Sequence, residues 1–191
     1  MRGVGREAGA CEVSSRFASN VPARRLAPFH ENAHLMNPMV NIEPLAAHRE
    51  AIPLLQRWFE AEWPSYYGAN GPGDAWHDLQ SFANLGSLPI GIVAVRDGKV
   101  CGVAALKAES IASHRHLCPW AAAGLVEPSA RGQGIGAKLL ITLEEQARTL
   151  GFRRIFCGTS TAESLLQRCG WQLMERIGHE GRGLGIYSKA L

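Results

Sequence analysis

The pattern of hydrophobic and polar positions becomes regular at Val40, and from there it predicts an alternation of strands and helices. Apolar residues recur every three or four positions over 47–63, the spacing of one helix face, and Pro64 stops that helix. Asp74 is a suitable N-cap for a second helix. The second helix is expected to bury Trp76, Leu79 and Phe82 on one face.

Short apolar runs predict strands around these helices. The runs at 90–95 and 100–106 flank Asp97-Gly98, a dipeptide typical of a tight hairpin turn. An amphipathic helix begins near Ile135 and ends at Gly151, a glycine in the usual C′ position. The remaining elements are strands at 40–43, 120–126, 154–157, 171–177 and 184–189, and a helix at 162–168.

In chain order these elements read β-α-α-β-β-β-α-β-α-β-β, which is typical of an α/β (α+β) domain with a mixed sheet covered by helices. The first 35 residues differ from this pattern, because they carry five arginines, three glutamates and no apolar periodicity. We therefore expect residues 1–35 to be a disordered or non-native tail, and residues 36–191 to form a single domain.

Composition and charge exclude several classes of protein. Hydrophobic residues make up 46% of the chain and charged residues 19%, which allows a buried core. A net charge of +3 is too slight for a nucleic-acid binder, and no apolar run approaches the roughly 20 residues that cross a bilayer. The five cysteines form no C-x-x-C pair, so we expect reduced, packed thiols in a cytoplasmic protein without a metal site.

The strongest candidate for chemistry is the glycine-rich turn Arg131-Gly132-Gln133-Gly134-Ile135-Gly136, between the strand at 120–126 and the third helix. Glycines at every second position let the backbone turn so that several N–H groups converge. A helix N-terminus adds unpaired N–H groups and the positive end of a dipole. The turn therefore predicts a bound phosphate or pyrophosphate.

Two common phosphate-binding motifs match this turn only in part. Residues 132–137 satisfy the dinucleotide-binding pattern G-x-G-x-x-G/A, but the strand at 154–157 carries no carboxylate for the ribose. The nucleoside triphosphate loop fails because Ala137 and Leu139 stand where Gly and Ser or Thr are required. A third interpretation is a glycine-rich helix start without a ligand, which would carry the conformational cost of glycine for no gain.

The pattern Val126-x-Pro128-x-x-Arg131-Gly132-x-Gly134-x-Gly136 resembles the acetyl-CoA site of the GCN5-related N-acetyltransferase (GNAT) family. The resemblance extends over about 40–191 and includes a closing helix-Gly170-Trp171 step, similar to the family's helix-Gly-Phe step. It implies the GNAT fold, in which helices flank a splayed central sheet. The pantetheine arm of the co-substrate acetyl-CoA would lie between the strand that ends at Val126 and the strand that ends at Cys157.

The resemblance also assigns residues to the cofactor. The backbone of Leu125 and Val126 would contact the pantetheine and the acetyl group, and the N–H groups of 132–137 would bind the pyrophosphate. Arg131 and Lys138 are candidates for neutralising the phosphates. The full implied set is Leu125, Val126, Arg131, Gly132, Gln133, Gly134, Ile135, Gly136, Ala137 and Lys138.

The reaction so implied is direct attack of a primary amine on the thioester, which needs a neutral amine and a protonated leaving thiolate. The side-chain bases and the tyrosine acid of many family members fall on Ala122, Trp120 and Leu166 here. His116 and Glu127 are the remaining candidates for proton transfer. The alternative function is a catalytically silent acyl-CoA-binding sensor on the same fold.

The acceptor is expected to be a small amine or a peptide N-terminus, bound by a monomer or homodimer without nucleic acid or membrane. Residues 59–76 mix aromatic and acidic side chains, which suits a cationic amine. The alternative is that the tryptophans of this segment belong to the core and its acidic side chains are solvated.

Deletion of residues 1–35 is expected to leave the melting temperature and the binding of CoA unchanged, because this segment has no pattern that could pack on the domain. Thermal unfolding of both chains, with and without CoA, measures the two quantities together. A loss of several degrees would show that the segment docks and that the domain boundary lies elsewhere.

Overall fold

The computed structural model describes residues 39–179 and 182–191, so the tail predicted at 1–35 lies outside the described residues. The strands are β1 (Asn41–Pro44), β2 (Ile90–Arg96), β3 (Lys99–Lys107), β4 (Trp120–Val126), β5 (Arg154–Thr159), β6 (Gln172–His179) and β7 (Arg182–Ala190). The helices are α1 (Ile52–Glu62), α2 (Pro64–Tyr67), α3 (Ala75–Phe82), α4 (Ile135–Thr149) and α5 (Glu163–Arg168).

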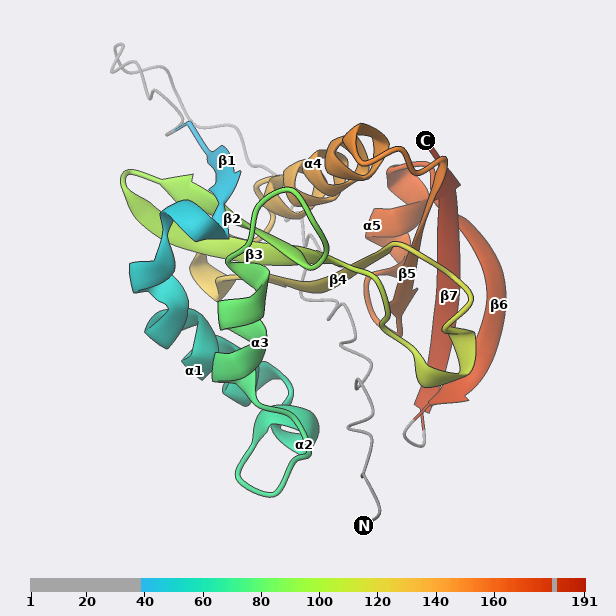
Figure 1. The fold of residues 1–191 in the computed structure, drawn as a ribbon, viewed down its shortest axis with the longest axis horizontal. Helices are drawn as coiled ribbons and strands as arrows, with labels where there is room; N and C mark the ends of the chain where they lie inside the picture. Colours follow the sequence, from blue (N-terminus) through green and yellow to red (C-terminus); the bar gives the residue numbers. More distant parts are fainter. Residues whose placement is uncertain (1–38, 180–181) are drawn as a thin grey trace, which may run out of the picture.

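All seven described strands lie in one mixed sheet, in the order β1-β2-β3-β4-β5-β7-β6. Helices α4 and α5 cover one face, and α1, α2 and α3 lie on the other face of the β1–β4 half (Figure 1). Because side chains alternate along a strand, Val93 and Val95 pack against α1 and α3, whereas Ile92 and Ala94 pack under α4. No helix in the described ranges combines the length and apolarity needed to cross a bilayer.

The connector between β3 and β4 covers the sheet face of the C-terminal arm that α5 leaves open. Ile111 is buried there together with Trp120 of β4, Phe156 of β5 and Ile186 of β7. A short 3-10 turn, η3 (Ala112–His114), forms the outer part of the connector. The result is a third small core, which fixes the connector beside β6 and β7.

The predicted order of elements is confirmed, with two local differences. Pro64 ends α1 as expected, but it also opens the additional short helix α2, in whose first turn its missing N–H costs nothing. The prediction that Trp76 is buried is wrong, because its side chain is 45% exposed. Ala75, Leu79 and Phe82 define the buried face of α3, and Trp76 lies about 100° round the helix from Ala75.

A buried ion pair joins α4 to the C-terminal arm of the sheet. The Glu144 carboxylate on α4 accepts hydrogen bonds from Trp171 Nε1 at 2.9 Å and from Lys189 Nζ at 2.7 Å. Lys189 Nζ also donates to the carbonyl oxygen of Cys169 at 2.7 Å. Only 3% of the Glu144 side chain is exposed, so these bonds compensate a charge removed from water.

Replacement of this carboxylate tests how much the ion pair contributes. Glu144→Ala is expected to lower the free energy of unfolding by about 1–3 kcal/mol, because it leaves the buried Trp171 Nε1–H without an acceptor and the partly buried Lys189 ammonium without its carboxylate. Urea denaturation measures the loss. The control is Glu163→Ala, which removes a bidentate but solvent-exposed pair with Arg176 and should cost much less. Equal losses in the two variants would contradict the assignment.

Candidate cofactor site

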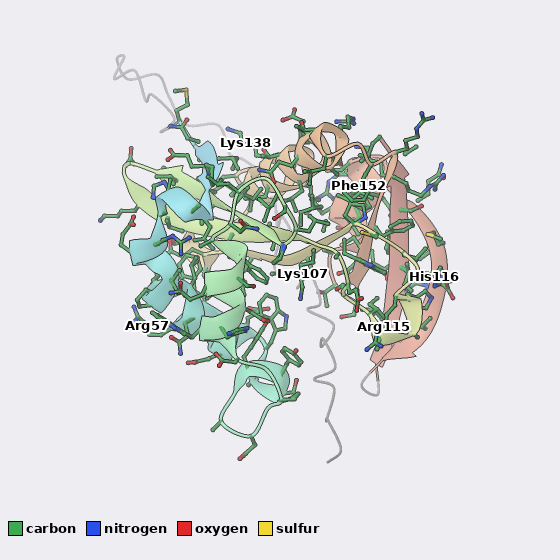
Figure 2. The ribbon with its side chains drawn as sticks, in the orientation of Figure 1. Arg57, Lys107, Arg115, His116, Lys138 and Phe152 are labelled. Atoms are coloured by element: carbon green, nitrogen blue, oxygen red, sulfur yellow. The ribbon has the colours of Figure 1, made fainter. Side chains whose placement is uncertain are left out.

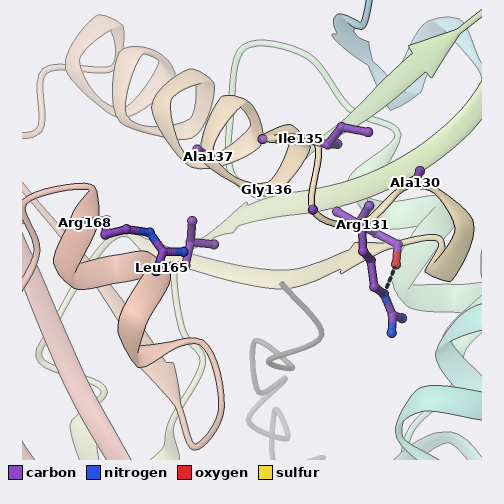
Figure 3. A pocket seen from close by; sticks show the side chains of 10 residues that line it. Ala130, Arg131, Ile135, Gly136, Ala137, Leu165 and Arg168 are labelled. Carbon is purple, nitrogen blue, oxygen red and sulfur yellow. Dashed lines mark hydrogen bonds between the residues drawn. The ribbon is translucent and has the colours of Figure 1, made fainter. Parts of the chain in front are cut away.

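A pocket of about 240 Å³ opens where α4 begins, between the glycine-rich turn and α5 (Figure 3). Its wall comes from the end of β4, from the turn with the first residues of α4, and from α5. The lining residues are Val126, Ala130, Arg131, Gly132, Gly134, Ile135, Gly136, Ala137, Leu165 and Arg168.

Two glycines of the turn adopt a backbone conformation that other residues rarely take. Gly132 has φ of 75° and Gly134 has φ of 77°, and a Cβ atom at either position would meet no other atom within 4 Å. Backbone conformation rather than close packing therefore requires glycine here. Gly134 is the N-cap of α4, and no described side chain caps this helix end. The first N–H groups of α4 are thus available to a ligand at the positive end of a 15-residue helix.

Strands β4 and β5 separate directly beside this pocket. Their parallel pairing consists of Trp120↔Phe156, after which the strands diverge (Figure 1). On its other edge β4 carries a bulge, because Ala122 pairs with Ala105 and Leu125 with Val103, so that one extra residue is inserted. Ala123 in the bulge has φ of 54°, a strained conformation for a residue with a side chain. The free edge of β4 offers backbone hydrogen-bonding groups along the gap.

The model of the acetyltransferase (GNAT) family matches residues 55–171. The chain belongs to the GNAT acetyltransferase family. The resemblance drawn from the glycine-rich turn is thereby confirmed, as are the fold class and the assignment to the acyltransferases.

Several solved structures share the GNAT fold at low sequence identity. An aminoglycoside 6'-N-acetyltransferase complexed with coenzyme A has a TM-score of 0.64 and 14% identity, over 78% of this chain and 96% of that chain. The aminoglycoside 6'-N-acetyltransferase from Enterococcus faecium has a TM-score of 0.63 at 14% identity, over 78% and 96%. N-acetylglutamate synthase from Neisseria gonorrhoeae, complexed with coenzyme A and N-acetyl-glutamate, has a TM-score of 0.56 and 22% identity, over 80% and 35%. No curated protein matches the chain.

Seven of the ten residues predicted for the cofactor line the pocket at the N-terminus of α4. Leu125, Gln133 and Lys138 do not line it. The Leu125 side chain belongs to the core under α1 and α3, and Gln133 Oε1 accepts a hydrogen bond from Arg96 at 2.6 Å. Lys138 lies on the opposite side of α4, beside β1, where its Nζ approaches the carbonyl oxygen of Val40 at 3.4 Å (Figure 2).

The two arginines of the pocket have different roles. Arg131 Nε donates to the carbonyl oxygen of Val126 at 2.8 Å, so its guanidinium fixes the turn to the end of β4 (Figure 3). Arg168 reaches the pocket from α5, next to Leu165. The sequence analysis missed Arg168, although it follows Leu165 by three positions and so lies on the same side of α5. A cation beside the N-terminus of α4 increases the attraction for an anion.

The candidates for proton transfer lie outside the pocket. His116 is exposed on the connector beside β6, where its neighbour His114 bonds Glu175 Oε1 at 3.0 Å (Figure 2). Glu127 follows β4, and its N–H donates to the carbonyl oxygen of Cys101 at 3.0 Å. Leu166, at the position of the family's tyrosine, is 0% exposed in the core under α4.

The prediction of reduced, packed cysteines holds only in part for the described cysteines, and Cys11 lies outside the described residues. Cys101 and Cys157 are buried and burial raises the pKa of both thiols, but Cys118 is exposed, so the prediction of packed cysteines is wrong at that position. In the described part of the chain, no three His, Cys, Asp or Glu side chains come close enough together to hold a metal ion.

CoA is expected to raise the melting temperature of the wild-type protein, because a ligand of the folded state stabilises it. Gly134→Glu is expected to abolish this rise, because a carboxylate would project into the open space in front of α4. The matched control is Gly151→Glu at the other end of the same helix, where φ is 87° and a Cβ atom also meets nothing within 4 Å. The control carries the same backbone strain and the same charge. If folded Gly134→Glu keeps the full CoA shift, the turn is not the binding site.

Proposed function

We propose that this GNAT protein transfers the acetyl group of acetyl-CoA to a primary amine by direct attack. The observation that carries this proposal is the pocket at the N-terminus of α4, bounded by two left-handed glycines and opening onto the gap between β4 and β5. The N-terminus of α4 suits the pyrophosphate of CoA. The neighbouring free edge of β4 suits the amide groups of the pantetheine arm that follows the pyrophosphate. The neighbours complexed with coenzyme A support this proposal.

The chain offers suitable groups for each part of acetyl-CoA. The N–H groups of 132–137 would bind the pyrophosphate, and Arg168 would neutralise phosphate charge from α5. The free edge of β4 near Leu125 and Val126 would hydrogen-bond the pantetheine and stabilise the oxyanion that develops on the acetyl group. When bound, acetyl-CoA supplies the activated thioester.

Proton transfer in this proposal depends on water. The described pocket lining contains no carboxylate or imidazole, so the amine must reach the thioester already neutral or lose its proton to water. Glu127 is the nearer of the two candidates, because it directly follows Val126, and it would accept a proton through water. His116 is too far along the connector to contact the pocket lining directly, and its contribution would be indirect.

The acceptor in this proposal is a small amine or a peptide N-terminus that approaches from the side of α1–α3. Trp58 and Trp63 pack against the core there, so they contribute shape rather than free aromatic surface. The Tyr67 hydroxyl donates to Asp78 Oδ2 at 2.7 Å, which fixes a carboxylate beside the aromatic residues. The relatives named above act on aminoglycosides or make N-acetyl-glutamate, so amine acceptors of different sizes occur on this fold.

A second candidate function is an acyl-CoA-binding sensor. The observation that favours it is Leu166, which fills the position of the family's acid with a buried apolar side chain. Without a donor for the leaving thiolate, binding would not lead to efficient turnover.

Release of free CoA thiol from acetyl-CoA across a panel of amines distinguishes the two functions. The panel should contain aminoglycosides, polyamines, amino acids and short peptides, with thermal shift by CoA measured on the same protein. Amine-dependent thiol release is expected, and a Gly134→Glu chain serves as the negative control. Binding of CoA without release for any amine would support the sensor and overturn the enzyme.

A further inference from the structure

The hairpin of β2 and β3 contacts the glycine-rich turn from outside the pocket. Arg96, the last residue of β2, donates from Nη1 to Gln133 Oε1 at 2.6 Å, although the two residues are 37 positions apart. Gln133 lies between the two left-handed glycines, Gly132 and Gly134. The other end of its amide, Nε2, approaches the carbonyl oxygen of Ser129 at 3.4 Å. One side chain therefore joins the middle of the turn to its beginning and to the hairpin.

Two further contacts hold the ends of the turn against the same hairpin. At the beginning, the N–H of Glu127 donates to the carbonyl oxygen of Cys101 at 3.0 Å, and Cys101 is the extra residue of a bulge in β3. At the end, a Cβ atom at Gly102 would come within 3.3 Å of Ile135 Cγ2, so β3 packs closely on the first residue of α4. Both ends of 127–135 are thus fixed, and the bond from Arg96 fixes the glycines between them.

The glycines are the part of the turn that most needs such support. Glycine loses more conformational freedom on ordering than any other residue. A ligand that requires several N–H groups of the turn to converge binds more weakly if it must also order the turn, and more tightly if the turn is already ordered. We propose that Arg96 is a positioning residue, which acts through Gln133 to hold the turn in its CoA-binding conformation. This inference rests on the proposed function, in which the turn binds the pyrophosphate.

The position of Arg96 separates its role from that of the arginine on α5. Arg168 lines the pocket, whereas Arg96 does not. The Arg96 guanidinium bonds the Gln133 side chain, and neither side chain belongs to the pocket lining. The effect of Arg96 on CoA is therefore indirect, and it should disappear when the Gln133 amide is removed.

A double-mutant cycle tests this dependence by calorimetric titration with CoA. Arg96→Ala and Gln133→Ala should each raise Kd by about 3- to 10-fold, and the double variant should bind no more weakly than either single variant, because all three lose the same bond. Arg96→Lys retains a donor and should recover part of the loss. The control is Arg148→Ala, which removes the same charge from an exposed position in the last turn of α4 and should leave Kd unchanged.

Two further measurements separate positioning from a general loss of stability. In the protein without ligand, the amides of 132–137 should exchange their hydrogens faster in Arg96→Ala than in wild type. With an amine acceptor, Arg96→Ala should raise KM for acetyl-CoA and leave kcat nearly unchanged. The KM for S-acetyl-pantetheine, which lacks the pyrophosphate, should not change.

The outcomes that contradict the inference are distinct from those that contradict the proposed function. Losses of affinity that multiply in the double variant would show that Arg96 acts on the phosphates itself. An unchanged Kd in folded Arg96→Ala would show that the bond to Gln133 has no effect on CoA. Either result overturns the positioning role while the cofactor site stands. If the folded wild-type protein does not bind CoA, the proposed function is wrong, and the inference with it.

Discussion

The separation of β4 from β5 is the constraint on which the rest of the molecule depends. A sheet that continued across these strands would satisfy their backbone groups, whereas the parallel pairing of β4 with β5 is limited to Trp120↔Phe156. Other contacts must therefore hold the two halves of the sheet together. Helix α4 spans both halves, since its leucines pack on β3 and β4 while Glu144 bonds Trp171 and Lys189 of the C-terminal arm. The buried ion pair thus stabilises the separated sheet.

The same separation creates the route that the proposed ligand follows. The pocket at the glycine-rich turn lies where β4 ends, at the outer end of the gap. Gly136, in the first turn of α4, lines this pocket. Helix α4 therefore provides the anion-binding terminus, at a position fixed by the packing of its leucines on the sheet.

Local patterns predicted the elements well because their causes are local. The Asp97-Gly98 hairpin, the Asp74 cap of α3 and Gly151 after α4 each follow from backbone or capping preferences of a few residues, and all three are present. The glycine-rich turn was predictable for the same reason. The sequence analysis failed where the answer depends on which neighbour covers a helix face. Trp76, predicted to be buried, is exposed.

The same limit applied to the candidate site. Lys138 follows the turn directly, yet its position on α4 points it toward β1, whereas Arg168, 30 positions further along, reaches the pocket from α5. The prediction of the catalytic residues was the least accurate. His116 was selected for its chemistry and its position before β4, but it does not line the pocket. The connector that carries it is fixed against β6 by His114 and Glu175. Hydrophobic periodicity could not predict this contact, because its two residues are 61 positions apart in the sequence.

The lack of an ionisable base in the described pocket lining has a consequence for the acceptor. If the protein does not take a proton from the amine, the neutral fraction of that amine in solution limits the rate. An α-amino group with an ordinary pKa of about 7.7–8.0 is roughly a tenth neutral at pH 7, whereas an alkylamine with a pKa of about 10.4 is neutral in fewer than about one molecule in a thousand. On this ground alone the α-amino group of a peptide has an advantage of about two orders of magnitude over an alkylamine. The proposed reaction would therefore favour a peptide N-terminus over a polyamine.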